Sequence, residues 1–350
     1  MNETKNDITI EEFTEKMKYA LQKYYGEEYN IITQKVRKNN DVELHAITIL
    51  EKGAHISPTI YLEPYYEAYL MDKTFSAVVL EVVELYQKNQ VNPEWDFTFF
   101  EEYEKVRPHI VYKLINYEKN KTRLEQIPHH KILDLAIICQ CLVQHSVQDQ
   151  GAIVIRNEHL EMWDITFDTV FQDAEKNTEK LCGFEVKNIN DVVQELFQEE
   201  TDETDLNEEQ IPNIGVMVHN NLEGNRKVSI ENTISKVKDD RDISNVYMYV
   251  LTNQKRVNGA ATILYKNLLQ EIAEQMNRNF ILLPSSIHEV IVIPEQDDLE
   301  VQNFNDMVRE VNETQLEPEE VLADHAYYYS LEKRQLSLLE PVDYGNKGYI

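Results

Sequence analysis

The side chains best able to do chemistry gather in one short stretch, residues 283–289, between two apolar runs. Ser285 and Ser286 offer hydroxyl nucleophiles. His288 could serve as a base that Glu289 orients, which is the set of groups a hydrolase uses. Members of such a triad normally converge from separate elements, and in a strand the side chains of His288 and Glu289 point to opposite faces. A turn whose serines bond to the backbone is the simpler interpretation, and a hydrolase using a Ser/His pair stays an alternative.

A tyrosine-rich segment at residues 61–69 is the second candidate for a contact surface. Tyrosine presents a large ring with a polar tip, which suits both partner interfaces and packing under a helix. Both interpretations remain open for this segment. The candidate ligand-binding or partner-binding residues are Ser285, Ser286, His288, Glu289, Tyr61, Tyr65 and Tyr66.

Familiar signatures of cofactor and metal sites are missing from the sequence. No glycine-rich phosphate loop and no G-x-S-x-G elbow occurs, and His288-Glu289 does not continue into H-E-x-x-H because residue 292 is valine. The three cysteines, Cys139, Cys141 and Cys182, offer no disulfide framework and are expected to be buried thiols. We therefore expect no cofactor, no metal and no catalytic residue, which favours a protein that is not an enzyme.

Acidic residues outnumber basic ones, 63 to 34, and give the chain a net charge of −29. This charge repels nucleic-acid phosphates, so we expect no direct binding of nucleic acid. It favours a basic protein partner, and one alternative function is an acidic inhibitor that mimics nucleic acid. The start lacks a signal-peptide pattern and no apolar run reaches 18 residues, so we expect a cytoplasmic protein that does not enter a membrane.

Hydrophobic periodicity predicts helices and strands in irregular alternation, with several hairpin-like strand pairs. Thr9 and Glu12 form a capping-box pattern at the start of a helix that Gly26 should end. This arrangement predicts an α+β fold of mixed, mostly antiparallel sheets with packed helices. Further helices are predicted at 65–88, 158–163, 167–177, 268–276 and 299–311, and strands at 30–37, 42–50, 59–62, 109–115, 131–142, 246–251, 260–265, 280–283 and 290–293.

Composition also suggests where the chain divides. Seven of the thirteen residues at 198–210 are acidic, and such a segment cannot bury enough apolar surface to order itself. The expected parts are an N-terminal α+β domain at 1–147, a central α/β unit at 148–197, an acidic linker or insertion at 198–245, a C-terminal α+β unit at 246–340 and a flexible tail at 341–350.

Six phrases together resemble a known family. They are YLEPYYEAY, VYKLINYEKN, NEHLEMW, VLTN, LPSSIHEV and MVREVN. The chain is similar, over roughly residues 8–335, to a bacterial family of acidic cytoplasmic proteins classed as a domain of unknown function. The family carries no catalytic assignment. The resemblance therefore implies a cytoplasmic location and a continuous domain, but it implies no mechanism. Together these features predict a non-enzymatic binding or regulatory protein.

Overall fold

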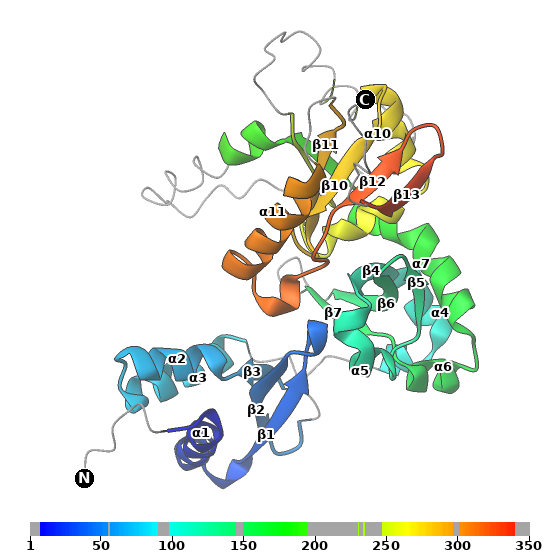
Figure 1. The fold of residues 1–350 in the computed structure, drawn as a ribbon. Helices are drawn as coiled ribbons and strands as arrows, with labels where there is room; N and C mark the ends of the chain where they lie inside the picture. The colour runs from blue at the N-terminus through cyan, green and yellow to red at the C-terminus, as the bar shows by residue number, and fades with distance from the viewer. Residues whose placement is uncertain are drawn as a thin grey trace, which may run out of the picture. The chain divides into compact units, whose positions relative to one another are not determined.

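The computed structural model describes residues 8–54, 57–89, 98–144, 150–194, 230, 234, 247–296 and 301–339. The chain divides into two compact units, residues 1–101 and 102–350, and each is described by itself. Helices pack against three sheets, and every described strand pair is antiparallel (Figure 1). The predicted α+β class is confirmed. The acidic stretch at 198–210 and the tail at 341–350 lie outside the described residues, and the finer domain bounds stay a prediction.

The first unit places a three-stranded sheet beside three helices. Its helix α1 begins with the predicted capping box, since Glu12 N–H donates to Thr9 Oγ1 at 3.3 Å and Thr9 N–H donates to Glu12 Oε2 at 3.1 Å. The sheet has the order β1-β2-β3. The elements are α1 (Ile10–Tyr25), β1 (Tyr29–Arg37), β2 (Glu43–Glu51), β3 (Thr59–Tyr61), α2 (Glu63–Met71) and α3 (Phe75–Lys88).

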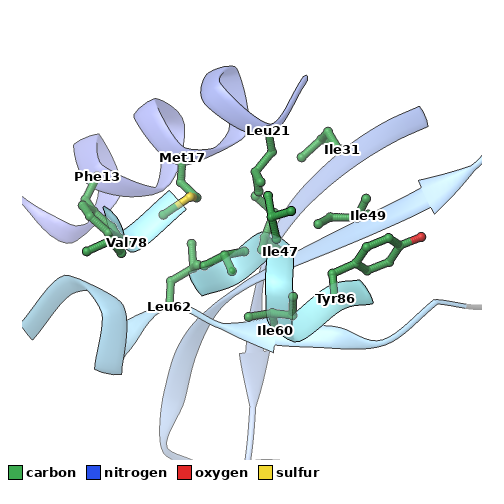
Figure 2. Packing of buried hydrophobic residues seen from close by; sticks show 12 residues of the cluster. Phe13, Met17, Leu21, Ile31, Ile47, Ile49, Ile60, Leu62, Val78 and Tyr86 are labelled. Carbon is green, nitrogen blue, oxygen red and sulfur yellow. The ribbon is translucent and has the colours of Figure 1, made fainter. Parts of the chain in front are cut away.

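The core of this unit lies between α1, α3 and one face of the sheet (Figure 2). Helical spacing puts Phe13, Met17 and Leu21 on the buried face of α1. They pack with Ile47 and Ile49 of β2, all fully buried. Each such side chain contributes about 1.5–3 kcal/mol when it leaves water.

One predicted helix, 65–88, is in fact two, α2 and α3. The break follows from Thr74, whose hydroxyl accepts the Ala77 N–H at 3.3 Å and caps α3. An N-cap residue takes an extended backbone, so α2 must end before it. The signal was present in the sequence, but the apolar stripe through Val78, Val82 and Tyr86 concealed it.

The second unit contains a four-stranded sheet in which β6 pairs with β4, β5 and β7. The single strand predicted at 131–142 is two strands, because the chain turns at Leu133 with a φ of 53°. Helix α7 packs on β4, where Tyr112 N–H donates to Thr178 Oγ1 at 3.0 Å. The elements are α4 (Tyr103–Val106), β4 (Ile110–Asn116), α5 (Lys121–Leu124), β5 (His129–Ile132), β6 (Leu135–Gln144), β7 (Gln150–Val154), α6 (Asn157–Trp163) and α7 (Phe167–Cys182).

The same unit holds a six-stranded sheet of order β13-β12-β10-β11-β9-β8. Helix α11 covers one face, where Phe304 and Val308 pack with Ile281 of β10. Helix α10 lies on the opposite face, and its Gln270 accepts the Tyr329 hydroxyl at 2.9 Å. The elements are β8 (Glu185–Asn188), β9 (Tyr249–Thr252), α10 (Leu268–Met276), β10 (Phe280–Pro284), β11 (Glu289–Pro294), α11 (Val301–Thr314), β12 (Tyr327–Ser330) and β13 (Gln335–Leu338).

The strand predicted at 260–265 is wrong. Residues Gly259–Leu264 form a 3₁₀ helix, η7, that follows β9. Ala260, Ala261 and Ile263 are all buried, so the apolar run has no period that could distinguish a strand from a helix.

A polar clasp joins the β5–β6 turn to the start of β12. The Asp134 carboxylate accepts the Tyr327 hydroxyl at 2.9 Å and lies 2.9 Å from His325 Nε2. The other ring nitrogen of His325 lies 3.1 Å from the Ala326 carbonyl oxygen. Both neighbours of the ring are acceptors, so the protonated imidazole, in which both nitrogens donate, satisfies both contacts.

Candidate functional site

A cavity of about 260 Å³ opens in the second unit, between the four-stranded sheet, α7 and the loop that follows β9. Val111 of β4, Leu142 of β6 and Ala152 of β7 supply part of its apolar wall. Residues of the 253–258 loop and of η7 supply another part. Concave, mainly apolar spaces with a few polar groups are typical of small-molecule sites.

One polar side chain of the wall has no hydrogen-bond partner among the residues that the structure describes. Gln140 is 6% exposed and lines the cavity, yet no hydrogen bond joins its amide to another residue that the structure describes. Tyr112, on the neighbouring strand, also lines the cavity, and its ring packs against Phe171 and Tyr265. Thr178 differs, because its hydroxyl donates to the Ala174 carbonyl at 2.6 Å and accepts the Tyr112 N–H. Gln140 is thus a group of this wall that a ligand could engage.

The 253–258 loop, which lines the cavity, is held in shape by the buried side chain of Asn253. Its Oδ1 accepts the N–H of Lys255 at 3.0 Å and of Val257 at 3.4 Å. Its amide donates to the Val257 carbonyl at 2.9 Å. Arg256 and Asn258 both take positive φ, 52° and 54°. This local network fixes the backbone conformation of the loop at Lys255. Lys255 is exposed and lines the cavity at its rim.

Residues 285–289 comprise the turn between β10 and β11 and the first residue of β11, and this segment contacts the 253–258 loop. His288 Nδ1 accepts the Asn258 N–H at 3.1 Å, and its carbonyl accepts the Thr252 hydroxyl at 2.7 Å. The approach is so close that only glycine fits at position 259. A Cβ there would overlap Thr252 Oγ1 and the His288 carbonyl oxygen, and would lie 2.7 Å from Asn253 N.

The turn does not pair its serines with the histidine ring. Ser286 Oγ accepts the backbone N–H of His288 at 2.9 Å, and Ser285 Oγ donates to Glu289 Oε1 at 3.3 Å. The His288 ring instead faces Asn258 and, through Nε2, a carboxylate oxygen of Glu320 at 3.8 Å. Among the described contacts the hydrolase alternative therefore has no nucleophile–base pair.

The three candidate tyrosines lie in the first unit. The Tyr66 hydroxyl donates to the Ile8 carbonyl at 2.8 Å, and its ring packs against Phe13. Tyr65 is partly buried against the same core, and burial raises the pKa of its hydroxyl. Lys38 Nζ lies 4.0 Å from the Tyr61 ring centre. Their packing is structural, and their use as a partner surface stays a prediction.

Burial determines the acidity of the three cysteine thiols. All three are free and buried, as expected from the sequence. Burial raises the pKa of Cys182, which lines the cavity, while the nearby charge of Lys255 acts in the opposite direction. Within the described ranges no three His, Cys, Asp or Glu side chains converge as a metal site would require.

The residues that line the cavity were not found from the sequence. They come from β4, β6, β7, α7 and the loop after β9, so no short spacing connects them. The one local signal was the Asn258-Gly259 dipeptide, because asparagine followed by glycine is typical of a turn.

Comparison with known proteins adds a family but no activity. None of the helices in the described residues has the length and apolar character needed to cross a membrane. No curated protein and no solved structure matches the chain. A family model matches residues 10–331, which is most of the sequence. The chain therefore belongs to the family of unknown function DUF5688.

Proposed function

We propose that this protein is a non-enzymatic binding protein that takes up a small molecule in the cavity beneath the 253–258 loop. The observation that carries the proposal is Gln140, a largely buried residue that lines the cavity and whose amide has no hydrogen-bond partner among the described residues. A wall that retains such a group favours a ligand that completes its hydrogen bonds.

The chemistry of the wall favours binding over catalysis. Burial raises the pKa of the Cys182 thiol, which keeps it protonated and a poor nucleophile at neutral pH. The Thr178 hydroxyl is already engaged by two backbone groups. None of the described residues that line the cavity is a histidine or a carboxylate, the side chains that most often act as a general base.

The turn at 285–289 has a supporting role in this proposal. It holds the loop through His288 and Asn258, and its Ile287 N–H donates to the Glu320 carbonyl at 2.8 Å. The phrase LPSSIHEV, which stands out in the sequence, then shapes the binding site without contacting the ligand. Ser285, Ser286 and Glu289 act within the turn.

A fragment screen on the full-length protein tests the proposal. Ligand-observed NMR should detect small, partly apolar fragments that bind the wild type. Binding should be lost when the cavity is filled by Ala152→Phe or Ala261→Leu, because both residues line it. Ala54→Phe, at an exposed position in the first unit, is the matched control and should keep binding.

Circular dichroism of each variant checks that it is folded. If one of the two cavity-filling variants does not fold, the other still tests the proposal. Fragments that bind both filled variants as tightly as the wild type would place binding elsewhere and refute the proposal. The absence of any fragment that binds the wild type would refute it as well.

A further inference from the structure

The cavity wall differs in charge from the rest of the molecule. Asp and Glu make up 63 of the 350 residues, and the net charge is −29. Yet none of the described residues that line the cavity is acidic, and one, Lys255, is basic. An anion approaching most of this surface meets repulsion, whereas at the cavity it meets a cation. The charges of Glu175 and Glu179 also reach Tyr112 of the wall, so it is the end of the cavity at Lys255 that favours an anionic group.

The Lys255 ammonium is available to a ligand. No ion pair joins it to a carboxylate among the described residues, whereas the neighbouring Arg256 lies 3.6 Å from Glu185. The Asn253 network fixes the backbone of Lys255, which limits where its side chain can reach. The charge acts within the site, since it affects the Cys182 thiol in the wall.

Size and polarity restrict the rest of the ligand. A cavity of about 260 Å³ has the volume of about nine water molecules in the liquid, which fits a body of roughly ten non-hydrogen atoms. Val111, Leu142 and Ala261 favour an apolar body. Lys255 is the one basic residue among the described residues of the lining, so one negative charge is matched there and a second would lack a described partner.

We propose that the ligand is a small monocarboxylate with an apolar body, whose carboxylate pairs with Lys255 at the rim while the body fills the cavity beside Gln140. This inference rests on the proposed binding function and adds the chemical class of the ligand. The carboxylate gains a charge-assisted hydrogen bond, and the apolar body gains burial.

Matched acids and amides test the class directly. Benzoate and hexanoate are compared with benzamide and hexanamide by ligand-observed NMR titration of the full-length protein at low salt. The acids should bind about fivefold more tightly, because a charge-assisted bond exceeds a neutral one. Lys255→Gln should lower the affinity of the protein for the acids to its affinity for the amides. Lys266→Gln removes the same charge at an exposed site that does not line the cavity and should leave the preference unchanged.

The outcomes separate the two proposals. Acids and amides that bind equally, with both lost in Ala152→Phe, would overturn the monocarboxylate class but leave the binding function intact. A tighter fit for phenyl phosphate than for benzoate would also overturn the class. No binding of any of these probes would overturn the class, and the fragment screen would then decide the binding function alone. An acid preference that disappears only in Lys255→Gln supports the inference.

Discussion

At the scale of single residues, the Asp134 clasp links protonation to stability. The hydrogen bond to Asp134, together with the Ala326 carbonyl and the negative charges nearby, raises the pKa of His325 against the opposing effect of burial. Burial acts to raise the pKa of Asp134, but its bonds to His325 and Tyr327 outweigh burial and lower it. The clasp is therefore at full strength when the histidine is protonated and the carboxylate is ionised.

The direction of each shift gives the pH window. The raised pKa of His325 contributes stability that is complete below about pH 6.5 and is lost as the pH rises through the folded-state value. The lowered pKa of Asp134 contributes stability that is present above about pH 4 and is lost as the pH falls through its folded-state value. Between these limits both contributions are present.

We predict that raising the pH from 6 to 9 removes about 1 kcal/mol of stability through the clasp, the difference between a charge-assisted and a neutral hydrogen bond. Urea unfolding at several pH values measures this loss. His325→Asn should lack that part of the pH dependence, whereas His109→Gln, at an exposed position, should keep it. A His325→Asn curve parallel to the wild type would contradict the assignment.

At the scale of elements, Gly259 is where β9, η7 and the β10–β11 turn meet most closely. We predict that Gly259→Ala lowers the free energy of unfolding by about 3 kcal/mol or more, because the new methyl group overlaps two backbone atoms that cannot rotate away. Gly151→Ala is the matched control. A Cβ there has no heavy atom within 4 Å, so its effect should stay within about 0.5 kcal/mol. Equal unfolding midpoints for the two variants would contradict the prediction and would show that the loop around residue 259 can shift to accommodate a methyl group.

The same elements show how far sequence reasoning could go. The capping box at Thr9 predicted the start of α1 because it is a local rule with a local cause. The strand predicted at 260–265 failed because burial on all sides removes the period. The 285–289 turn was recognised as a polar turn, but its support of Asn258 depends on a contact thirty residues away along the chain. The cavity could not be predicted, since its wall is assembled by the packing of distant strands and a helix.

At the scale of the whole molecule, the excess acidic side chains repel one another, and dissolved salt can screen this repulsion. With a net charge of −29, we predict that raising sodium chloride from 0.05 to 0.5 M at pH 7 increases the melting temperature by a few degrees. Differential scanning calorimetry measures the shift. The increase should shrink near pH 5, where carboxylates begin to take up protons. A melting temperature that falls with salt would mean that ion pairs, not repulsion, dominate.

A basic protein partner and the nucleic-acid-mimic alternative stay predictions.

The order of strands in the six-stranded sheet has a consequence for how the chain folds. The β10–β11 and β12–β13 neighbours are adjacent in sequence, so their hairpins need to close only short loops and can nucleate within microseconds. Strand β8 pairs with β9 through Asn188 and Tyr249, across a long stretch of intervening chain. Because loop closure costs more entropy as the loop grows, we expect β8 to add last, onto a template already built from the C-terminal half. During synthesis on the ribosome, β8 then emerges well before its partner strand and must wait unpaired until the rest of the sheet has been made.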